Sequence, residues 1–395
     1  MSRVLWVTSS YPWVGDPVGG IFFGTQARML VRLGLEVTVV SPTPVAPWPL
    51  PLLRRRWRDY AAVPSTGTDE GVLILRPRYP NVPGQPSWSA PDRLIARAAA
   101  RVRPSWSEAR LIHGHYSLVG LAAWRLARRT GLPLVLTFHG DDLNRWPEDH
   151  PERLADLRSA LRAAAAVTAV SAPLVERIRS LAGVEAIHLP LGCDHERLAR
   201  AAIDRDVARQ ALGIPPDAVV VLFVGLLHRT KGLYELSEAL QRAGRPFYGV
   251  FVGDGPERPG LARQAGPSVD LRGAQPNDEV VRFMCAADVL VLPSYREGLP
   301  TVLVEAGSLR LPVIASRVGG IPDLLAEDRG MLLTDITPDA IVASLRAFVA
   351  DREAARARAS RLRDHVLRYH STAQSASRLL EIYRSIAPDL RPAPA

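Results

Sequence analysis

The sequence has few of the features that mark secreted or membrane-spanning proteins. Only two of its 395 residues are cysteine, Cys193 and Cys285, too few for a disulfide framework or a cysteine-based zinc site. The longest apolar run, Ala218–Val224, has seven residues, whereas a membrane-spanning helix needs about twenty. The N-terminal apolar stretch is too short for a signal peptide. These absences predict a soluble, reduced, cytoplasmic protein.

Lysine is also nearly absent, because Lys231 is the single lysine among 49 basic residues. A compact ammonium differs from a planar guanidinium in how it meets an anion. Position 231 is therefore a candidate functional position, with chance as the alternative.

Charge is unevenly distributed along the chain. The net charge is +9, of which residues 1–200 carry +8 and the remainder +1. A basic half favours an anionic partner such as an anionic lipid or a phosphorylated substrate. No nucleic-acid recognition motif accompanies the charge, so we expect no nucleic-acid partner. A compositional bias towards arginine, with no partner behind it, is the alternative.

Short apolar runs alternate with helical patterns in both halves of the chain, which predicts an α/β protein with two doubly wound, mostly parallel sheets. The break between the halves falls near Pro190–Pro216, and residues 41–70 are expected to be irregular. The strands expected in the first half are Val4–Thr8, Glu36–Val40, Val72–Leu75, Leu111–His115, Leu134–Phe138, Ala166–Val170 and Ala186–Leu189. Those expected in the second half are Val219–Val224, Tyr248–Val252, Val269–Arg272, Val289–Pro293, Val313–Ser316 and Met331–Leu333.

Ligands of such sheets bind outside the carboxyl ends of the strands, so the residues that follow strands are the candidates. In the first half, Gly19 and Gly20 precede a helix, where backbone N–H groups can approach an anion or sugar. A flexible turn is the alternative. His139 follows another strand and can hydrogen-bond a substrate or stabilise charge in a transition state.

The second half holds a glycine-bounded loop, Gly225–Gly232, that carries Arg229 and Lys231 before a helix. This arrangement predicts a cradle for a diphosphate. Further on, Glu297 lies in a loop after a strand and Glu305 lies on the next helix. Backbone amides from Leu299 to Val302 can then hold phosphate while the two acids bind sugar hydroxyls, as a sugar nucleotide requires.

In this order, the motifs resemble the retaining, nucleotide-sugar-dependent glycosyltransferases of family 4. The resemblance implies the GT-B fold, with two facing Rossmann-like doubly wound domains and a deep inter-domain cleft. It implies an acceptor-side domain over residues 1–192, a nucleotide-sugar domain over residues 193–370, and a C-terminal helix, 371–390, that packs back on the first domain. The motifs that carry it are Gly19-Gly20, Thr137–Asp142, Val170–Pro173, Leu191–Asp194, Phe223–Leu227, Lys231-Gly232, Val252–Glu257, Ala287-Asp288, Pro293–Ala306 and Val318–Pro322.

The resemblance also implies roles for single residues. Lys231 would contact the donor diphosphate, Glu297 the hexose and Glu305 the ribose. His139 and the Gly19-Gly20 loop would complete the site from the first domain. The implied catalytic residues are His139, Glu297 and Lys231. The implied donor-binding residues are Gly19, Gly20, Gly225, Arg229, Lys231, Asp270, Leu271, Glu297, Gly298, Leu299, Pro300, Thr301, Val302 and Glu305.

The implied reaction retains anomeric configuration and needs no metal ion and no cofactor, because the departing phosphate itself helps to deprotonate the acceptor. The sequence departs from the family at Leu226, where the family usually has arginine. Arg229 can substitute from three residues further on.

The predicted function is transfer of a hexose from a nucleoside-diphosphate sugar to a hydroxyl acceptor in cell-surface or exopolysaccharide assembly. The acceptor is a carbohydrate or a lipid-linked glycan. The basic segment Leu50–Tyr60 predicts peripheral contact with the anionic inner face of the membrane, with a solvated arginine-rich helix as the alternative. A sugar-nucleotide epimerase of the same fold and an inactive sugar-nucleotide-binding protein are the alternatives for the function.

Overall fold

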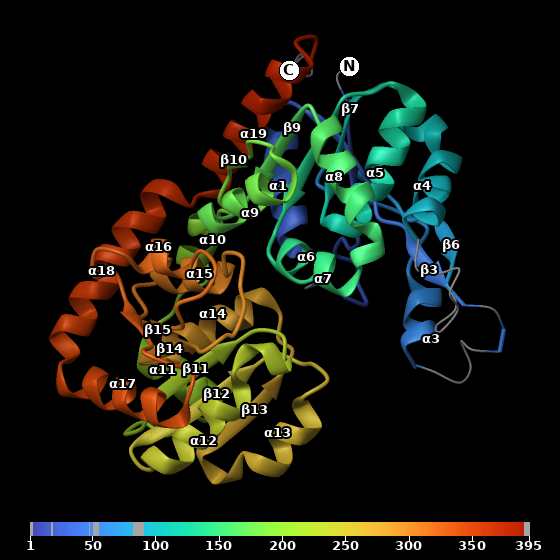
Figure 1. The fold of residues 1–395 in the computed structure, drawn as a ribbon. Helices are drawn as coiled ribbons and strands as arrows, with labels where there is room; N and C mark the ends of the chain where they lie inside the picture. Colours follow the sequence, from blue (N-terminus) through green and yellow to red (C-terminus); the bar gives the residue numbers. More distant parts are fainter. Residues whose placement is uncertain (1–2, 17–18, 47, 50–54, 82–90, 391–395) are drawn as a thin grey trace. The chain divides into compact units, whose positions relative to one another are not determined.

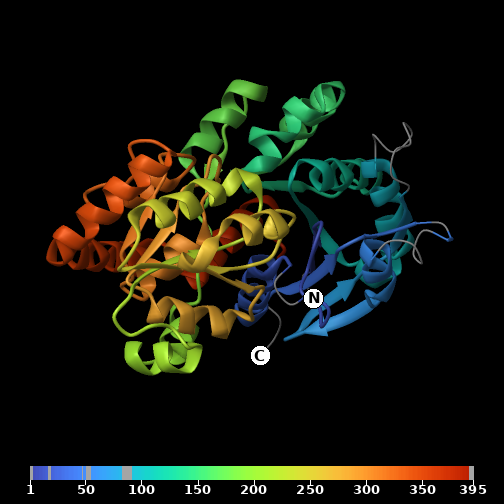
Figure 2. The same cartoon turned by 90° about the horizontal axis from the view of Figure 1, so that it is seen from below.

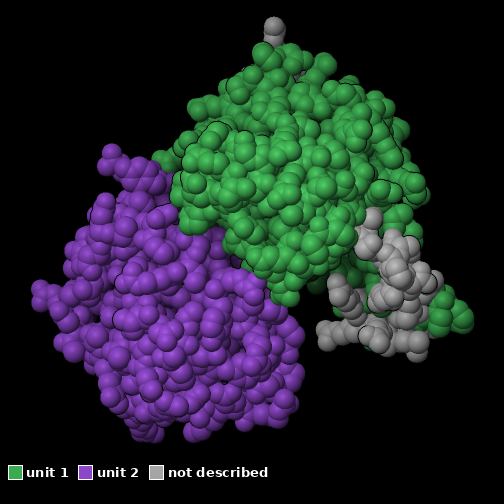
Figure 3. Space-filling view, viewed as in Figure 1, with its two compact units in different colours: residues 1–190, 372–395 green, residues 191–371 purple. Residues whose placement is uncertain are grey.

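The chain forms two compact units, which Figure 3 shows in different colours. The structure is a computed structural model that describes residues 3–16, 19–46, 48–49, 55–81 and 91–390. Unit 1 comprises residues 1–190 and 372–395, and unit 2 comprises residues 191–371. The last helix of the chain therefore belongs to the first unit.

Unit 1 is built on an eight-stranded sheet with the order β10-β9-β8-β7-β1-β2-β5-β4. Only the edge strand β4 of this sheet runs antiparallel to its neighbour. The chain turns from one side of β1 to the other, so the carboxyl ends of β1 and β7 form a topological switch point. The strands are β1 Arg3–Val7, β2 Glu36–Val40, β4 Thr66–Asp69, β5 Val72–Leu75, β7 Ala109–His115, β8 Leu134–Phe138, β9 Ala166–Ala169 and β10 Ile187–His188, beside a separate pair, β3 Thr43–Val45 and β6 Arg78–Pro80.

Helices lie on both faces of this sheet (Figures 1 and 2), which explains why its central strands are buried along almost their whole length. The sequence of helix α1 explains how the helix packs, because Phe23, Ala27 and Leu30 recur on its one buried face. The helices of unit 1 are α1 Ile21–Arg32, α3 Arg55–Ala62, α4 Pro91–Arg101, α5 Ser117–Thr130, α6 Asp141–Asn144, α7 Trp146–Asp149, α8 Leu154–Ala163, α9 Ala172–Ala182 and α19 Thr372–Ile386.

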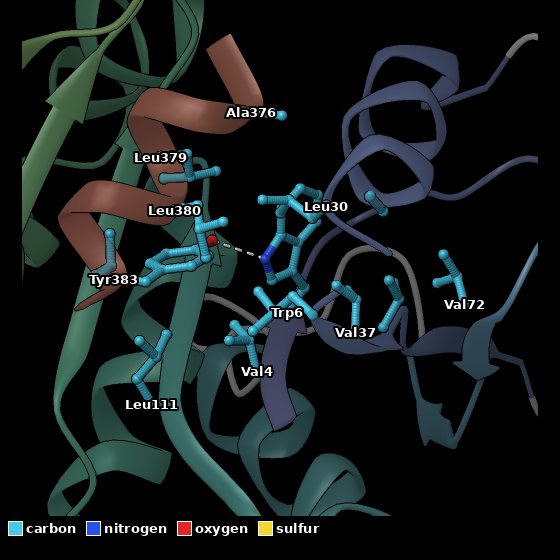
Figure 4. Close-up of a cluster of buried hydrophobic side chains, with 14 of the residues drawn as sticks. Val4, Trp6, Leu30, Val37, Val72, Leu111, Ala376, Leu379, Leu380 and Tyr383 are labelled. Atoms are coloured by element: carbon cyan, nitrogen blue, oxygen red, sulfur yellow. Dashed lines mark hydrogen bonds between the residues drawn. The ribbon is translucent and has the colours of Figure 1, made fainter. Parts of the chain in front are cut away.

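A buried hydrogen-bond chain ties α19 to the sheet of unit 1. The Trp6 indole N–H donates to the Tyr383 hydroxyl over 2.9 Å (Figure 4), and that hydroxyl also contacts His113 Nδ1. His113 Nε2 lies 2.6 Å from Thr137 Oγ1. Burial lowers the pKa of His113 to about 3, so its ring is neutral. The Tyr383 hydroxyl therefore donates to Nδ1 while it accepts from Trp6, and Nε2–H donates to Thr137.

We expect Tyr383→Phe to destabilise unit 1 by about 1–3 kcal/mol, because it leaves a buried indole N–H and a buried imidazole nitrogen without a partner. Amide hydrogen exchange should quicken in α19, and urea should unfold the variant at lower concentration. Tyr369→Phe is the matched control, because Tyr369 is 55% exposed. If amide hydrogen exchange in α19 were equally fast in Tyr383→Phe and Tyr369→Phe, the buried hydrogen-bond chain would not be what holds α19.

Unit 2 is built on a six-stranded, all-parallel sheet with the order β13-β12-β11-β14-β15-β16. Its switch point lies between β11 and β14. The strands are β11 Val219–Val224, β12 Phe247–Val252, β13 Val269–Gly273, β14 Val289–Leu292, β15 Val313–Ala315 and β16 Met331–Leu332. The helices are α10 His195–Ala201, α11 Arg205–Leu212, α12 Leu233–Ala243, α13 Arg258–Gln264, α14 Asn277–Ala286, α15 Thr301–Ser308, α16 Ile321–Leu325, α17 Pro338–Ala350 and α18 Arg352–Tyr369.

Every strand predicted from the sequence is present in these two sheets. The expectation that residues 41–70 are irregular is wrong, because β3, α3 and β4 form there. Each of these elements is short or lies at an edge, so its apolar pattern is weak.

The basic segment Leu50–Tyr60 is described only in part. Residues 50–54 lie outside the described residues, and α3 begins at Arg55. Trp57 packs against Tyr60 and is 6% exposed, so its indole does not face solvent. Within the described part of the chain, every helix is too short or too polar to cross a bilayer.

Candidate functional site

Lys231 and Glu297 meet at the switch point of unit 2. Lys231 ends the loop after β11, and Glu297 lies in the loop after β14, the neighbouring strand. Lys231 Nζ lies 2.6 Å from Glu297 Oε1, with the side chains 23% and 9% exposed. Parallel strands that adjoin at a switch point bring their following loops together, which is why residues 66 positions apart form this pair.

Glycine lets the two loops touch. Gly232 has φ 64°, and a Cβ added there would lie 2.1 Å from the Pro293 carbonyl oxygen. A backbone hydrogen bond joins the same loops: the Tyr295 N–H donates to the Thr230 carbonyl oxygen over 2.8 Å. Any other residue at position 232 would therefore push Lys231 away from the loop that carries Glu297.

Glu297 is held on two further sides. The Ser294 hydroxyl donates to the same Oε1 atom over 2.6 Å. Gly319, with φ 56°, lets the loop after β15 approach, since a Cβ there would lie 2.2 Å from the Glu297 carbonyl oxygen. Ser294, two residues after β14, is a contact of Glu297 that was not predicted from the sequence.

The residues from Gly298 to Val302 form the entry to α15. Gly298 and Leu299 are buried, Pro300 precedes the helix, and Thr301 and Val302 begin it. No side chain caps the helix, and its first turn carries no acid. A helix N-terminus with free N–H groups favours a bound anion. The positive end of α15 therefore lies directly after the loop that holds the Lys231–Glu297 pair.

Gly225 and Arg229, two further predicted donor residues, belong to the same loop after β11 as Lys231. Gly225, with φ 155°, follows β11, and exposed Arg229 stacks on Tyr234 at 5.7 Å. Leu226, the residue that departs from the family, is 58% exposed.

Asp270 and Leu271 lie within β13 rather than after it. The Asp270 carboxylate accepts from Arg272 Nε over 2.6 Å and from the Tyr248 hydroxyl over 3.2 Å. The expectation that Asp270 and Leu271 lie near the nucleotide base stays a prediction.

Glu305 lies on α15, beyond the helix entry, and forms no hydrogen bond or ion pair with Lys231 or Glu297 among the described residues. Its side chain is partly buried near Cys193 and Arg197. Burial raises the pKa of Glu305 to about 7, against the opposing effect of the Arg197 guanidinium.

Unit 1 has its own switch point, at the carboxyl ends of β1 and β7. Gly20, with φ 74°, caps α1 without a side-chain bond, and the first turn of α1 carries no acid. The Gly19 N–H donates to Asp16 Oδ1 over 2.8 Å. Like the entry to α15, this helix entry is an N-terminus without a side-chain cap that follows a switch-point strand.

His139 follows β8 and lies among aromatic rings. The ring centroids of Phe22, Phe23 and Tyr116 lie 5.2, 5.3 and 4.8 Å from that of His139. Its Nε2 lies 3.2 Å from His115 Nδ1, and its buried Nδ1 has no hydrogen-bond partner among the described residues. Burial lowers the pKa of His139 to about 3. The ring is therefore neutral, with a buried Nδ1 that has no partner among the described residues.

Asp142 holds the turn that carries His139. Its carboxylate accepts the backbone N–H groups of His139 at 3.1 Å and Gly140 at 2.6 Å. Burial raises the pKa of Asp142 to about 7, although these N–H bonds act against the shift. The sequence shows this acid but not that it fixes the histidine backbone.

Comparison with known proteins identifies the family. Residues 204–364 match the family described as Glycosyl transferases group 1, and residues 20–197 match the one described as Glycosyltransferase Family 4. TuaC of Bacillus subtilis (strain 168), named as a teichuronic acid biosynthesis glycosyltransferase, is 36% identical over 350 residues, 88% of this chain and 89% of TuaC. The chain belongs to glycosyltransferase family 4. These matches confirm the family that was predicted from the sequence, and with it the predicted glycosyltransferase activity.

Solved structures show the fold of this family 4 glycosyltransferase. Sucrose-phosphate synthase from Thermosynechococcus elongatus has a TM-score of 0.79 at 21% identity and covers 97% of this chain and 99% of its own. Anabaena HepE in complex with UDP-glucose has a TM-score of 0.74 at 17% identity, over 97% and 99%. The predicted GT-B fold, with two Rossmann-like domains, is confirmed.

In this glycosyltransferase we expect Glu305→Gln to change how stability depends on pH. The folded pKa near 7 exceeds the ordinary value of 4.5, so the folded state holds a proton that the unfolded state has lost. Wild-type stability therefore falls as pH rises from 4.5 to 7. The free energy of unfolding of Glu305→Gln relative to wild type should therefore be about 2 kcal/mol higher at pH 8 than at pH 5, a value discounted for the partial exposure of Glu305.

Urea unfolding of the unliganded protein at both pH values measures the difference. Glu353→Gln, at an exposed position on α18, is the control for removal of a carboxylate. A stability difference between Glu305→Gln and wild type that does not vary with pH would show that the Glu305 carboxyl is not shifted.

Proposed function

We propose that this family 4 glycosyltransferase transfers a hexose from a nucleoside-diphosphate sugar to a hydroxyl group, with retention of anomeric configuration and without a metal ion or cofactor. The observation that carries the proposal is the Lys231–Glu297 pair, 2.6 Å apart, directly before the uncapped N-terminus of α15. A cation beside free helix N–H groups suits a diphosphate, and an adjacent carboxylate suits sugar hydroxyls.

In the proposed step the bond between the anomeric carbon and the diphosphate oxygen breaks while the acceptor oxygen bonds to that carbon. The acceptor proton passes to the departing phosphate oxygen on the same face of the sugar, which gives retention. Lys231 and the N–H groups of Thr301 and Val302 stabilise the negative charge that builds up on the leaving diphosphate. Lys231 supplies the charge that a metal ion supplies in other phosphate sites.

Two further side chains have proposed roles. Neutral His139 hydrogen-bonds a sugar hydroxyl through its available Nδ1. Glu305 binds the ribose diol of the donor. A uridine nucleotide is the first donor to test, because HepE is solved with UDP-glucose.

The proposed setting is cell-surface glycan assembly at the cytoplasmic face of the membrane. TuaC is named for teichuronic acid biosynthesis, and residues 1–200 carry a net charge of +8. A positive surface of this kind favours contact with anionic lipid and with a lipid-linked or carbohydrate acceptor.

A panel of uridine, guanosine and adenosine diphosphate sugars tests the proposal. A donor that binds the folded state should raise the melting temperature, and slow release of nucleoside diphosphate should follow as water replaces the acceptor. EDTA should leave the release rate unchanged. Epimerised donor would instead identify an epimerase, and binding without turnover an inactive protein.

A further inference from the structure

Five arginines line a cavity on unit 1, and none of them belongs to the site described above. The cavity has a volume of about 400 Å³ and is lined by Arg93 and Arg97 of α4 and by Arg125, Arg128 and Arg129 of α5. The two helices lie side by side (Figure 1). Volumes of roughly 300–1,000 Å³ are typical of small-molecule sites.

Only one of the five is neutralised by the protein. Arg125 pairs with the fully buried Asp92 and, over 2.9 Å, with Asp156. The other four are exposed and form no ion pair within the described residues. The positions outside the description contain no aspartate or glutamate in the sequence. Four guanidinium groups are therefore without a carboxylate partner among the described residues.

These charges are placed where they repel one another. Arg93 and Arg97, both without an ion pair among the described residues, are four residues apart on α4, whereas Arg125, four residues before Arg129 on α5, already pairs with Asp92 and Asp156. Like charges at this spacing on a helix disfavour folding. An anion bound beside these arginines would offset this repulsion.

Buried side chains next to the lining arginines hold two of them in place. Asp92 accepts from Arg125 and also from Arg153 Nη2 over 2.7 Å, which fixes the Arg125 guanidinium. The nearly buried Trp124 ring supports two of the arginines, with Arg125 Cζ 5.5 Å and Arg128 Cζ 5.2 Å from its centroid. The site is therefore partly organised without a ligand.

We propose that this arginine cavity binds a diphosphate-bearing ligand. Guanidinium groups match phosphate oxygens in paired, planar hydrogen bonds. Two linked phosphates present more acceptor oxygens than a single phosphate, so one ligand can pair with guanidinium groups of both helices. The proposal does not depend on the proposed transfer reaction.

Arginine modification with phenylglyoxal, read out by peptide mass spectrometry, tests the site residue by residue. With sodium pyrophosphate at about ten times its Kd, modification of Arg93, Arg97, Arg128 and Arg129 should fall about tenfold relative to sodium chloride of equal ionic strength. Exposed Arg346 and Arg356 of unit 2 should be unaffected. Because the readout names each arginine, pyrophosphate bound beside Lys231 cannot be mistaken for it.

The double variant Arg97→Gln/Arg128→Gln removes one charge from each helix. It should abolish the protection of Arg93 and Arg129. Its melting temperature without ligand should equal or exceed that of wild type at low salt, because repulsion is relieved. Arg346→Gln/Arg356→Gln is the matched control, with the same loss of charge on exposed helix positions that have no ion pair among the described residues. In this control variant, pyrophosphate should still protect Arg93 and Arg129 from modification as fully as in wild type.

Equal modification with pyrophosphate and with chloride would overturn the proposal. Protection by vesicles of phosphatidylglycerol without protection by pyrophosphate would also overturn it and identify a membrane surface instead. Stronger protection by farnesyl diphosphate than by pyrophosphate would support a lipid-linked diphosphate, and equal protection would support a soluble one.

Discussion

Lys231→Ala is expected to lower the kcat of sugar transfer by at least about 100-fold, as does loss of other groups that stabilise transition-state charge. The chain has no second lysine to replace it. Glu297→Ala should cost at least about 100-fold as well, because it removes the carboxylate that Lys231 and Ser294 both contact. Initial rates at saturating donor give both values.

Three comparisons make this prediction specific. Lys231→Arg keeps the charge but changes its geometry, so it should fall between wild type and Lys231→Ala. Glu238→Gln breaks an exposed ion pair with Arg242 on α12 and should transfer at the normal rate. In the double variant Lys231→Ala/Glu297→Ala, kcat should fall by less than the product of the two single reductions, because the pair acts as a unit. Near-normal rates in both alanine variants would refute these roles.

Asp92→Ala is expected to destabilise unit 1 by about 3–5 kcal/mol, the usual cost of breaking a buried ion pair by removing one partner. The Asp92 side chain is fully buried and pairs with Arg125 and Arg153, which are themselves 17% and 8% exposed. Without the carboxylate, two largely desolvated guanidinium groups lose the negative charge that offsets the cost of their burial. Urea denaturation followed by circular dichroism measures the loss.

Asp156→Ala is the matched control, because Asp156 pairs with the same two arginines but is 39% exposed. Exposed ion pairs contribute only about 0–1 kcal/mol. If the two alanine variants were equally stable, burial would not be what gives Asp92 its importance.

The strands could be predicted because buried parallel sheets need nearly continuous apolar runs, which are easy to see in Val219–Val224 or Val289–Leu292. The elements that were missed are short or lie at an edge. Strand β4, Thr66–Asp69, has an alternating pattern of partly exposed residues and carries no such run.

Candidate residues of the site could be named for a related reason. Lys231 stands out by composition, and Glu297 by its place after an apolar strand. Ser294 was not singled out, because a serine after a strand is common and its bond to Glu297 depends on how one loop folds. The neutral state of His139 also depends on Phe22, Phe23 and Tyr116, which the chain brings from two other elements.

The sequence by itself determined the alternation of strands and helices, the family, and the acids and the lysine that follow strand ends. Local residue pattern is enough for these, because each depends on neighbours in the chain. Only the tertiary structure decided that Lys231 touches Glu297, that Glu305 is buried enough to hold a proton near neutral pH, and that five arginines of α4 and α5 share one cavity. Contact and desolvation arise from strand order and helix packing, which bring together residues far apart in sequence.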